Sequence, residues 1–426
     1  MKETMAVIAF TGQGRQLAQK LIAGLKENPP GGSGCNITGY ATQEKTGAAG
    51  DQSIGAFTPS ADLTPADSLI SFASLRELVR ELWSQSRALI FIGACGIAVR
   101  SIAPYVKDKT RDPAVLVLDE KGRFVISLLS GHIGGANELT LAIAGLVGAQ
   151  PVITTATDIN QVFAVDSWAI KAGLHIVNPQ VIKEISGSLL AGRPVGLISQ
   201  YPIKGPLPAG LEDLSSSSGS QSRSGKQSCS GSQARPQAGI RIASAVETEA
   251  FPENPESFDT PETADSADIP ESSTFTFTLN LLPKNLVLGC GCRRGTSEAQ
   301  IREAVFTVLQ QYNLSPRRLR LISSIDLKRD EKGLLDFAAA MELPLVFFSA
   351  DQLAQAPGDF TPSAYVKEVT GVDNVCERSA LLGARRFAEG RDSLEGNATG
   401  RLLIPKTPLN GVTVAVYEQD FTVIFP

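Results

Sequence analysis

One glycine-rich turn carries the residue type best suited to acid–base chemistry. His132 is one of two histidines in the chain, and it stands within Ser130-Gly131-His132-Ile133-Gly134-Gly135. An apolar run precedes this turn and a helical pattern follows it, which indicates a strand-to-helix connection. Histidine alone has an ordinary pKa near 7, and loops at strand ends carry function in α/β sheets. We therefore interpret His132 as a candidate general base, with a purely structural turn as the alternative.

Polar groups near His132 could complete such a site. Asn137 opens the helical pattern, where its amide could cap the helix or bind a substrate. The backbone N–H groups from Gly134 and Gly135 to Asn137 could stabilise an oxyanion at this helix start. After a strand at 151–155, Thr155 and Asp158 fit either a turn or a site.

A serine nucleophile is not indicated at this turn. Ser130 lies in Leu-Leu-Ser-Gly-His, which lacks the G-x-S-x-G motif of serine hydrolases. We therefore interpret Ser130 as a candidate binding residue.

Glycines and cations precede the histidine turn. A strand at 88–93 runs into Gly93-Ala-Cys-Gly96, where the backbone can turn tightly and approach a ligand. Four cations follow within a short stretch: Arg100, Lys107, Lys109 and Arg111. We expect this segment to hold anionic groups.

Metal and nucleotide sites are weakly indicated. Cys290-Gly-Cys292 lacks the C-x-x-C spacing and the partner ligands of a zinc site, and we expect Arg293 beside it to hold a carboxylate. Lys328 follows the next strand and could line the same sheet edge or form a solvated pair. Gly12-Gln13-Gly14 lacks the third glycine of a dinucleotide turn.

Composition excludes several classes of protein. The chain has 426 residues and a net charge of −5, with 42% hydrophobic residues, which is typical of a globular protein and gives no sign of nucleic-acid binding. Its longest nearly apolar run, 88–99, is well short of the roughly 20 residues of a membrane span. The first residues show no secretory signal pattern, and six cysteines do not make a disulfide scaffold. We expect a cytoplasmic protein.

Strand and helix patterns alternate on both sides of one low-complexity stretch. This alternation predicts two or three α/β sandwich domains with mostly parallel or mixed sheets. A Ser-rich tract and then an acidic Pro-rich tract interrupt the alternation, which is typical of a disordered linker. The predicted organisation is an N-terminal domain at 1–160, a central segment at 161–211, a linker at 212–282 and a C-terminal domain at 283–426.

Several strings resemble one known family. The N-terminal ones are GACGIAVRSIAPYVKDKTRDPAVLVLDEKGRFVISLLSGHIGGAN and PVITTATD; the C-terminal ones are LGCGCRRGTSEAQI, SSIDLKRDEKGLL, LVFFSADQL and NVCERSALLGA. They resemble the cobalt-precorrin-5A hydrolases of anaerobic cobalamin biosynthesis. The resemblance covers about 1–200 and 283–426.

The resemblance implies a reaction. The family opens the δ-lactone of cobalt-precorrin-5A with water and releases acetaldehyde, giving cobalt-precorrin-5B. The substrate brings its own cobalt, so the resemblance implies no cofactor of the enzyme's own. The implied partners are this corrinoid and other enzymes of the corrin pathway.

The resemblance also suggests roles for particular residues. His132 would be the base, with Asn137 and the helix start stabilising the oxyanion. Arg100 and Lys109 would anchor substrate carboxylates, joined by Arg293 and Lys328. Removal of a hydroxyl proton during fragmentation could involve Glu138, Asp158 or Glu377, which the sequence does not rank.

Two other functions remain open from the residues. A non-catalytic corrinoid carrier, presenting intermediates to pathway methyltransferases, would use the same basic and glycine-rich loops. A nucleotide-dependent enzyme would use the turn at Gly12-Gln13-Gly14. Release of acetaldehyde distinguishes the hydrolase from both.

Overall fold

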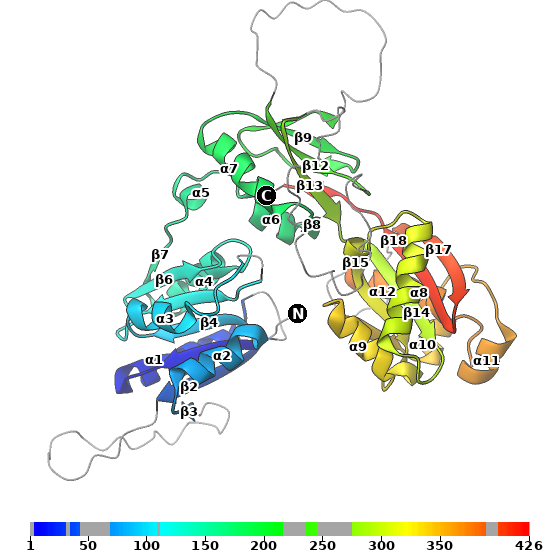
Figure 1. Ribbon diagram of the computed structural model, residues 1–426, viewed down its shortest axis with the longest axis horizontal. Coiled ribbons are helices and arrows are strands. Elements are labelled where there is room, and N and C mark those ends of the chain that lie inside the picture. The colour runs from blue at the N-terminus through cyan, green and yellow to red at the C-terminus, as the bar shows by residue number, and fades with distance from the viewer. Residues whose placement is uncertain are drawn as a thin grey trace, which may run out of the picture. The chain divides into compact units, whose positions relative to one another are not determined.

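The computed structural model describes residues 4–30, 35–42, 69–108, 111–215, 236–245, 275–388 and 399–425 (Figure 1). The chain forms two compact units, Lys2–Ser167 and Trp168–Pro426, and the division falls within helix α6 (Val165–Lys171). Within the described ranges, no helix combines the length and apolar character that a membrane crossing requires.

The first unit is built on one mixed sheet in the order β3-β2-β1-β4-β5-β6-β7. The strands β1 to β5 are parallel to one another, whereas β6 runs antiparallel to β5 and β7 runs parallel to β6. The bounds are β1 (Thr4–Ala9), β2 (Asn36–Thr42), β3 (Ile70–Phe72), β4 (Ser86–Ile92), β5 (Ala114–Leu118), β6 (Phe124–Leu129) and β7 (Gln150–Val152).

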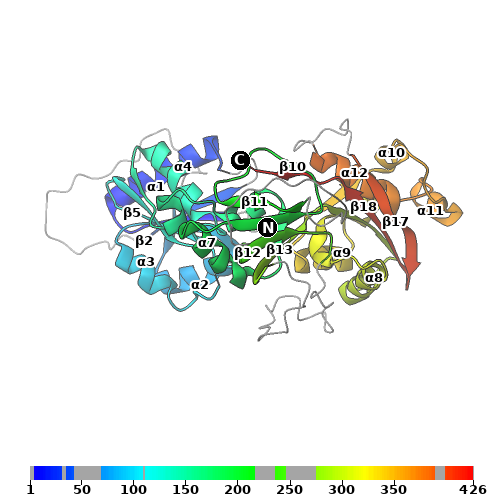
Figure 2. The same cartoon turned by 90° about the horizontal axis from the view of Figure 1, so that it is seen from above.

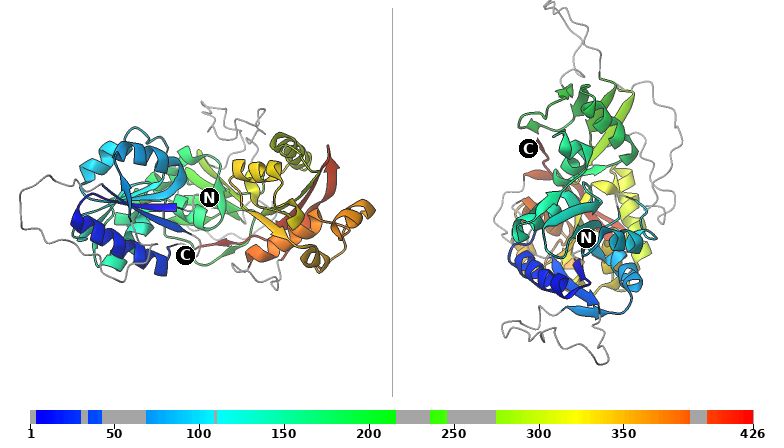
Figure 3. Two further views of the ribbon diagram at one scale, coloured as in Figure 1. Left: turned by 90° about the horizontal axis from the view of Figure 1, so that it is seen from below. Right: turned by 90° about the vertical axis from the view of Figure 1, so that its left-hand side faces the viewer.

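Helices cover both faces of this sheet, as the left view of Figure 3 shows for its blue strands. One face packs against α1 (Gly12–Glu27) and α4 (Ala136–Val147), and the other against α2 (Leu75–Gln85) and α3 (Cys95–Ile102). The short helix α5 (Ala156–Ile159) follows β7. This three-layer arrangement confirms the predicted α/β class for the first unit.

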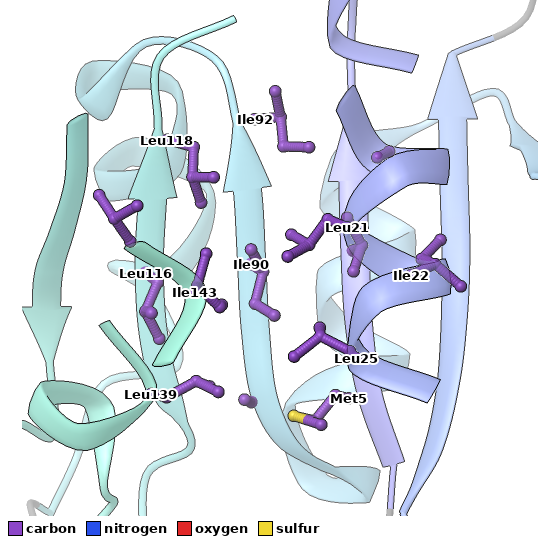
Figure 4. Close-up of a cluster of buried hydrophobic side chains, with 14 of the residues drawn as sticks. Met5, Leu21, Ile22, Leu25, Ile90, Ile92, Leu116, Leu118, Leu139 and Ile143 are labelled. Atoms are coloured by element: carbon purple, nitrogen blue, oxygen red, sulfur yellow. The ribbon is translucent and has the colours of Figure 1, made fainter. Parts of the chain in front are cut away.

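Helix α1 shows how the sequence builds these layers. The Thr11 hydroxyl accepts a hydrogen bond from the Gly14 N–H and caps the helix start. Leu21 and Leu25, one turn apart, are fully buried against the sheet. They pack with Met5 and Ile90 in the core that Figure 4 shows. This spacing of leucines is typical of a helix with one buried face.

The turn between β5 and β6 reverses the chain and decides where the site lies. The Asp119 carboxylate accepts hydrogen bonds from the N–H groups of Lys121, Arg123 and Phe124. Leu118 pairs with Val125, and the last residue of β6 pairs with Val115, near the start of β5. The carboxyl end of β6 therefore lies at the amino edge of the five parallel strands.

The second unit contains a central sheet in the order β11-β9-β12-β13-β8, with α7 (Ile182–Leu190) packed on it. Its strands are β8 (Leu174–Ile176), β9 (Val195–Ser199), β11 (Leu211–Asp213), β12 (Ala238–Ile242) and β13 (Phe277–Pro283).

These strands differ from the predicted domain boundaries. Strands β12 and β13 lie within 212–282, for which the sequence predicted a disordered linker, and β11 crosses its start. Their apolar residues, such as Ile240 and Leu279, are fully buried, so short runs inside a polar tract do form a core. The predictions for 216–235 and 246–274 lie outside the described residues. The first unit ends at Ser167 rather than at residue 160.

The C-terminal sheet of the second unit has the order β16-β15-β14-β18-β17. Its strands are β14 (Leu286–Cys292), β15 (Leu319–Ile325), β16 (Leu345–Phe348), β17 (Gly400–Leu409) and β18 (Val412–Gln419). Helices α8 (Glu298–Gln311) and α9 (Lys332–Ala340) pack on one face, and α10 (Ala350–Ala354) and α12 (Cys376–Ala388) on the other (Figure 2). Helix α11 (Ala364–Thr370) precedes α12. This sheet also confirms the predicted α/β class.

A buried arginine joins the two sheets of the second unit. Arg318 is 1% exposed and lies just before β15. Its guanidinium donates to the Ser244 carbonyl after β12, to Asn285 Oδ1 before β14 and to Glu418 Oε1 on β18. A buried cation needs such partners, because an unpaired one would be strongly destabilising.

The second histidine, His175, is a largely buried residue of the second unit. His175 lies on β8 opposite Leu282, and burial together with the charges of Arg317 and Lys284 lowers its pKa to about 3. The folded protein therefore holds this imidazole neutral at pH values where the unfolded chain would protonate it.

We predict that His175 makes the second unit sensitive to acid. Its contribution to stability is complete above pH 6.5 and is lost as the pH falls toward 3, because only the unfolded chain takes up the proton. Between pH 6.5 and 5 the free energy of unfolding should fall by about 1.5–2 kcal/mol. Denaturant titrations at several pH values should show that His175→Leu reduces this dependence. An unchanged dependence would contradict the assignment.

Candidate active site

The candidate active site lies at the amino edge of the parallel strands of the first unit. The turn 130–135 follows β6, and residues 155–158 follow β7, which runs in the same direction. Both connections therefore reach one edge of the sheet. The structure brings His132, Asn137 and Asp158 together there, as all three predicted catalytic residues are in hydrogen-bond contact.

Glycines allow this turn to fold tightly. A Cβ atom on Gly134 would lie 2.4 Å from Ser130 Cβ and 2.8 Å from the Ser130 carbonyl oxygen, which is closer than atoms can approach. Gly135 has a φ of +79°, which L side chains rarely adopt, and forms the N-cap of α4. Ser130 itself has a φ of +58°. Residues with side chains in place of Gly134 and Gly135 could not adopt this turn, and the position of His132 depends on it.

His132 lies between two carboxylates. Its Nε2 is 2.8 Å from Asp158 Oδ2 on α5, and its Nδ1 is 3.5 Å from Asp166 Oδ2 on α6. Thr157 Oγ1 lies 3.2 Å from Nε2. The side chains of His132 and Asp166 are 15% and 10% exposed, whereas that of Asp158 is 38% exposed. Solvent therefore reaches the cluster mainly from the side of Asp158.

The carboxylates stabilise the protonated form of His132. The hydrogen bond to Asp166 raises the pKa of His132 most, and the charge of Asp166 and the contacts with Asp158 raise it further. Partial burial opposes this shift but does not cancel it. The imidazolium form therefore persists above pH 6.5.

Asn137 holds the carboxylate in place. Its Oδ1 accepts a hydrogen bond of 2.6 Å from Ser127 on β6. Its Nδ2 donates to Thr155 Oγ1 at 3.1 Å and to Asp158 Oδ2 at 2.9 Å. Every hydrogen-bonding group of this amide is used, which fixes its orientation. Thr155, a predicted binding residue, belongs to this network.

The helix start does not supply the expected set of oxyanion donors. The N–H of Gly135 donates to the His132 carbonyl, that of Ala136 to Ser130 and that of Asn137 to Gly131. These bonds close the turn, so the three N–H groups are not free for a ligand. Within the described part of the chain, the Gly134 N–H has no acceptor and remains a candidate donor.

A basic loop reaches the same edge. The Ser130 hydroxyl donates to the Asp112 carbonyl, and the Asp112 carboxylate accepts from the N–H groups of Lys107 and Asp108. The exposed side chain of Lys107 therefore belongs to a loop in contact with the histidine turn. Arg100 is exposed near the end of α3, which leads into this loop. Lys109 lies outside the described residues.

The loop Gly93–Gly96 lies elsewhere. It follows β4, and Ile92 pairs with Leu118 at the carboxyl edge of the parallel strands. The histidine turn lies at the opposite, amino edge. The two glycine-rich loops of the first unit therefore do not form one site.

The remaining predicted site residues belong to the second unit. Arg293 and Arg294 are exposed after β14, and Lys328 follows β15, which is parallel to β14. Lys328 pairs with Glu331 at 3.2 Å, and the Glu331 carboxylate accepts from the Gly295 N–H. The strand order therefore places Arg293 and Lys328 at one sheet edge, where Lys328 is engaged in an ion pair that is mostly buried rather than solvated.

Glu377 occupies a closed position in the second unit. It is fully buried, and its carboxylate accepts four hydrogen bonds. The donors are Thr361 N, Thr361 Oγ1, Asn374 Nδ2 and Lys406 N. This arrangement joins the start of α12 to the loop before α11 and to β17, which favours a structural role over substrate binding.

Sequence reasoning missed two groups of the histidine cluster. Thr157 was visible in the polar run after β7, but nothing indicated its contact with His132. Asp166 starts a helix and resembles an ordinary first-turn acid. Only the path of the chain after α5 brings it to the ring.

No group of three or more His, Cys, Asp or Glu side chains within the described ranges is arranged to hold a metal ion. In the histidine cluster the two carboxylates lie at opposite ring nitrogens. They therefore clamp the ring and do not converge on a common point.

We predict that Glu377→Gln lowers the free energy of unfolding of the second unit by about 2–3 kcal/mol. The NH₂ group of Gln would replace a carboxylate oxygen that accepts hydrogen bonds, so buried donors would face another donor. Denaturant unfolding measures this. The exposed Glu368 on α11 offers a control, since Glu368→Gln should change stability by less than about 0.5 kcal/mol. A stable Glu377→Gln protein with lowered substrate affinity would instead indicate a binding role.

Two family models match the chain. Cobalamin synthesis G N-terminal matches residues 77–158, which include the histidine turn, Asn137 and Asp158. Cobalamin synthesis G C-terminus matches residues 286–417, which include the C-terminal sheet.

Curated relatives cover most of the chain. A cobalt-precorrin-5A hydrolase of Salmonella typhimurium is 34% identical over 71% of this chain and 78% of its own length. A cobalt-precorrin-5A hydrolase of Priestia megaterium is 32% identical over 76% of this chain and 78% of its own length. Protein CobE of a Sinorhizobium species is 36% identical over 24% of this chain and 68% of its own length. With two family models and two such relatives, the chain belongs to the cobalt-precorrin-5A hydrolase family of cobalamin biosynthesis.

Proposed function

We propose that this protein is a cobalt-precorrin-5A hydrolase. It opens the δ-lactone of cobalt-precorrin-5A with water, releases acetaldehyde and gives cobalt-precorrin-5B. The names and coverage of the curated relatives favour this activity over a carrier role. The observation that carries the proposal in the structure is the His132–Asp158–Asn137 cluster, which the N-terminal family model includes.

The cluster fits the chemistry of lactone opening. The reaction needs a base for water and a fixed arrangement of charged groups around the reacting carbonyl. The Asp158 carboxylate is half-exposed and held by His132 and Asn137, so it is both oriented and open to water. Of the three candidates for proton removal, Asp158 is the one in hydrogen-bond contact with both His132 and Asn137, whereas Glu377 is buried in the second unit.

Cations of both units suit the acetate and propionate groups of a corrinoid. Arg100 and Lys107 are exposed on the segment that leads to the histidine turn. On the second unit Arg293 is exposed after β14, whereas Lys328 is mostly buried and already pairs with Glu331. Arg100, Lys107 and Arg293 would each offer a charge-assisted hydrogen bond to a carboxylate. The substrate supplies the cobalt, and the protein needs no metal of its own.

The cellular compartment is proposed from the pathway and from the redox state of the cysteines. The five cysteines in the described ranges are all free, which suits a reducing compartment, and we propose the cytoplasm. Other enzymes of the corrin pathway would supply the substrate and take up the product.

We predict that the purified protein releases acetaldehyde from cobalt-precorrin-5A. His132→Gln should lower the rate by about 100-fold or more, because a neutral amide cannot hold the Asp158 carboxylate by charge. A coupled alcohol dehydrogenase assay measures the acetaldehyde. Glu120→Gln serves as a control with full activity, since Glu120 pairs with Thr11 at the opposite edge of the sheet.

Two results would contradict the proposal. A wild-type protein that binds the corrinoid without releasing acetaldehyde would be a carrier. Near-normal turnover by a folded His132→Gln protein would remove the histidine cluster from the reaction.

A further inference from the structure

We infer that Asp158 is the catalytic base and that Asp166, a residue outside the expected site, positions it through the protonated ring of His132. This inference rests on the proposed function and refines its mechanism. It reverses the role that the sequence suggested for His132.

The first argument is the hydrogen-bonding capacity of the ring. A neutral imidazole has one N–H and one lone pair, whereas the imidazolium has two N–H groups. His132 faces carboxylate oxygens at both nitrogens, at 2.8 Å from Asp158 and 3.5 Å from Asp166. Carboxylates only accept hydrogen bonds, so a neutral ring would turn its lone pair toward one of them. The geometry therefore fits the cation.

The second argument is that His132 has no free nitrogen. A general base must reach a proton with an unoccupied lone pair at about 3 Å. Nε2 is engaged by Asp158 and lies beside Thr157, and Nδ1 faces the mostly buried Asp166. Neither nitrogen is left for a water molecule.

The third argument is the open oxygen of Asp158. Its Oδ2 accepts from both His132 and Asn137. Within the described part of the chain, its Oδ1 has no hydrogen-bond partner, and the side chain is 38% exposed. One oxygen thus anchors the carboxylate and the other is available to water, as a positioned base requires.

The chemical step balances without a further reactant. Water forms a bond from its oxygen to the lactone carbonyl carbon while Asp158 Oδ1 takes one of its protons. The tetrahedral intermediate then breaks the ring C–O bond, and the leaving oxygen recovers the proton from Asp158. This opening gives a carboxylic acid and a free hydroxyl group, and Asp158 returns to its ionised form. Acetaldehyde leaves in a following step, in which this hydroxyl group loses its proton, the C–C bond to the ring breaks and the ring carbon takes up a proton.

The charged groups that face the ring decide its titration. They are Asp158 on α5 and Asp166 on α6, while α4 contributes the neutral Asn137. Both carboxylates raise the pKa of His132, and Asp166 contributes the largest share. If His132 lost its proton, the ring would lose its hydrogen bond to Asp166. The ring would then hold the Asp158 carboxylate less firmly. Activity should therefore fall as the pH rises through the raised pKa of His132.

The pH profile of kcat/KM for acetaldehyde release tests this inference. In the wild type the rate should fall on the alkaline side above pH 6.5. In Asp166→Asn this fall should move to lower pH, because the negative charge beside the ring is lost. The rate at pH 6 should stay within about threefold of the wild type, because the amide oxygen of Asn can still accept a hydrogen bond from Nδ1. Asp158→Asn should lose about 100-fold or more at every pH.

Two outcomes of these profiles would overturn the inference. A wild-type rate that rises with pH through the His132 titration would make the neutral imidazole the base. An Asp166→Asn profile that coincides with the wild type would remove Asp166 from the positioning of the ring.

A titration without substrate separates this inference from the proposed function. The chain has two histidines, and His175 stays neutral between pH 5 and 9 because its pKa is about 3. One histidine ring signal should therefore titrate in proton NMR, above pH 6.5 in the wild type and at lower pH in Asp166→Asn. If the wild type releases no acetaldehyde, the proposed function and the base assignment fail together. A His132 signal that titrates below pH 6.5 would overturn the protonated ring whatever the activity.

Discussion

The imidazolium of His132 between two carboxylates is the interaction on which the candidate site depends. Asp158 and Asp166 come from α5 and α6 and lie at opposite nitrogens of the ring. The positive ring offsets the repulsion that two nearby carboxylates would otherwise exert. It thereby keeps the Asp158 carboxylate oriented and open to water, while Asn137 donates a hydrogen bond to the same oxygen. The site is preorganised by charge and by hydrogen bonds together.

The position of this cluster follows from one reversal of the chain. The Asp119 turn sends β6 back antiparallel to β5, so the histidine turn opens at the amino edge of the parallel strands. Ligands of open α/β sheets usually bind at the carboxyl edge, where the loop Gly93–Gly96 lies. The run Asp119-Glu-Lys-Gly122 is typical of a hairpin turn. Its consequence, that the two glycine-rich loops separate, could have been derived from it.

Sequence patterns identified the α/β class and the three residues that meet at the site. Periodicity and turn chemistry are local, and these features depend on local patterns. The contact of Asp166 with His132 and the burial of Glu377 depend on segments that are distant in the chain. No local sequence pattern encodes such contacts. Strand β12 was missed for a related reason: its short apolar run becomes a strand only through pairing with β9 and β13.

Neutron diffraction from a crystal grown near pH 7 would test the central claim most directly, because deuterium positions on the His132 ring can be seen. The account predicts a deuterium on both Nδ1 and Nε2, with the Nε2 deuterium directed at Asp158 Oδ2. A ring that carries one deuterium, with an unprotonated nitrogen facing either carboxylate, would contradict it.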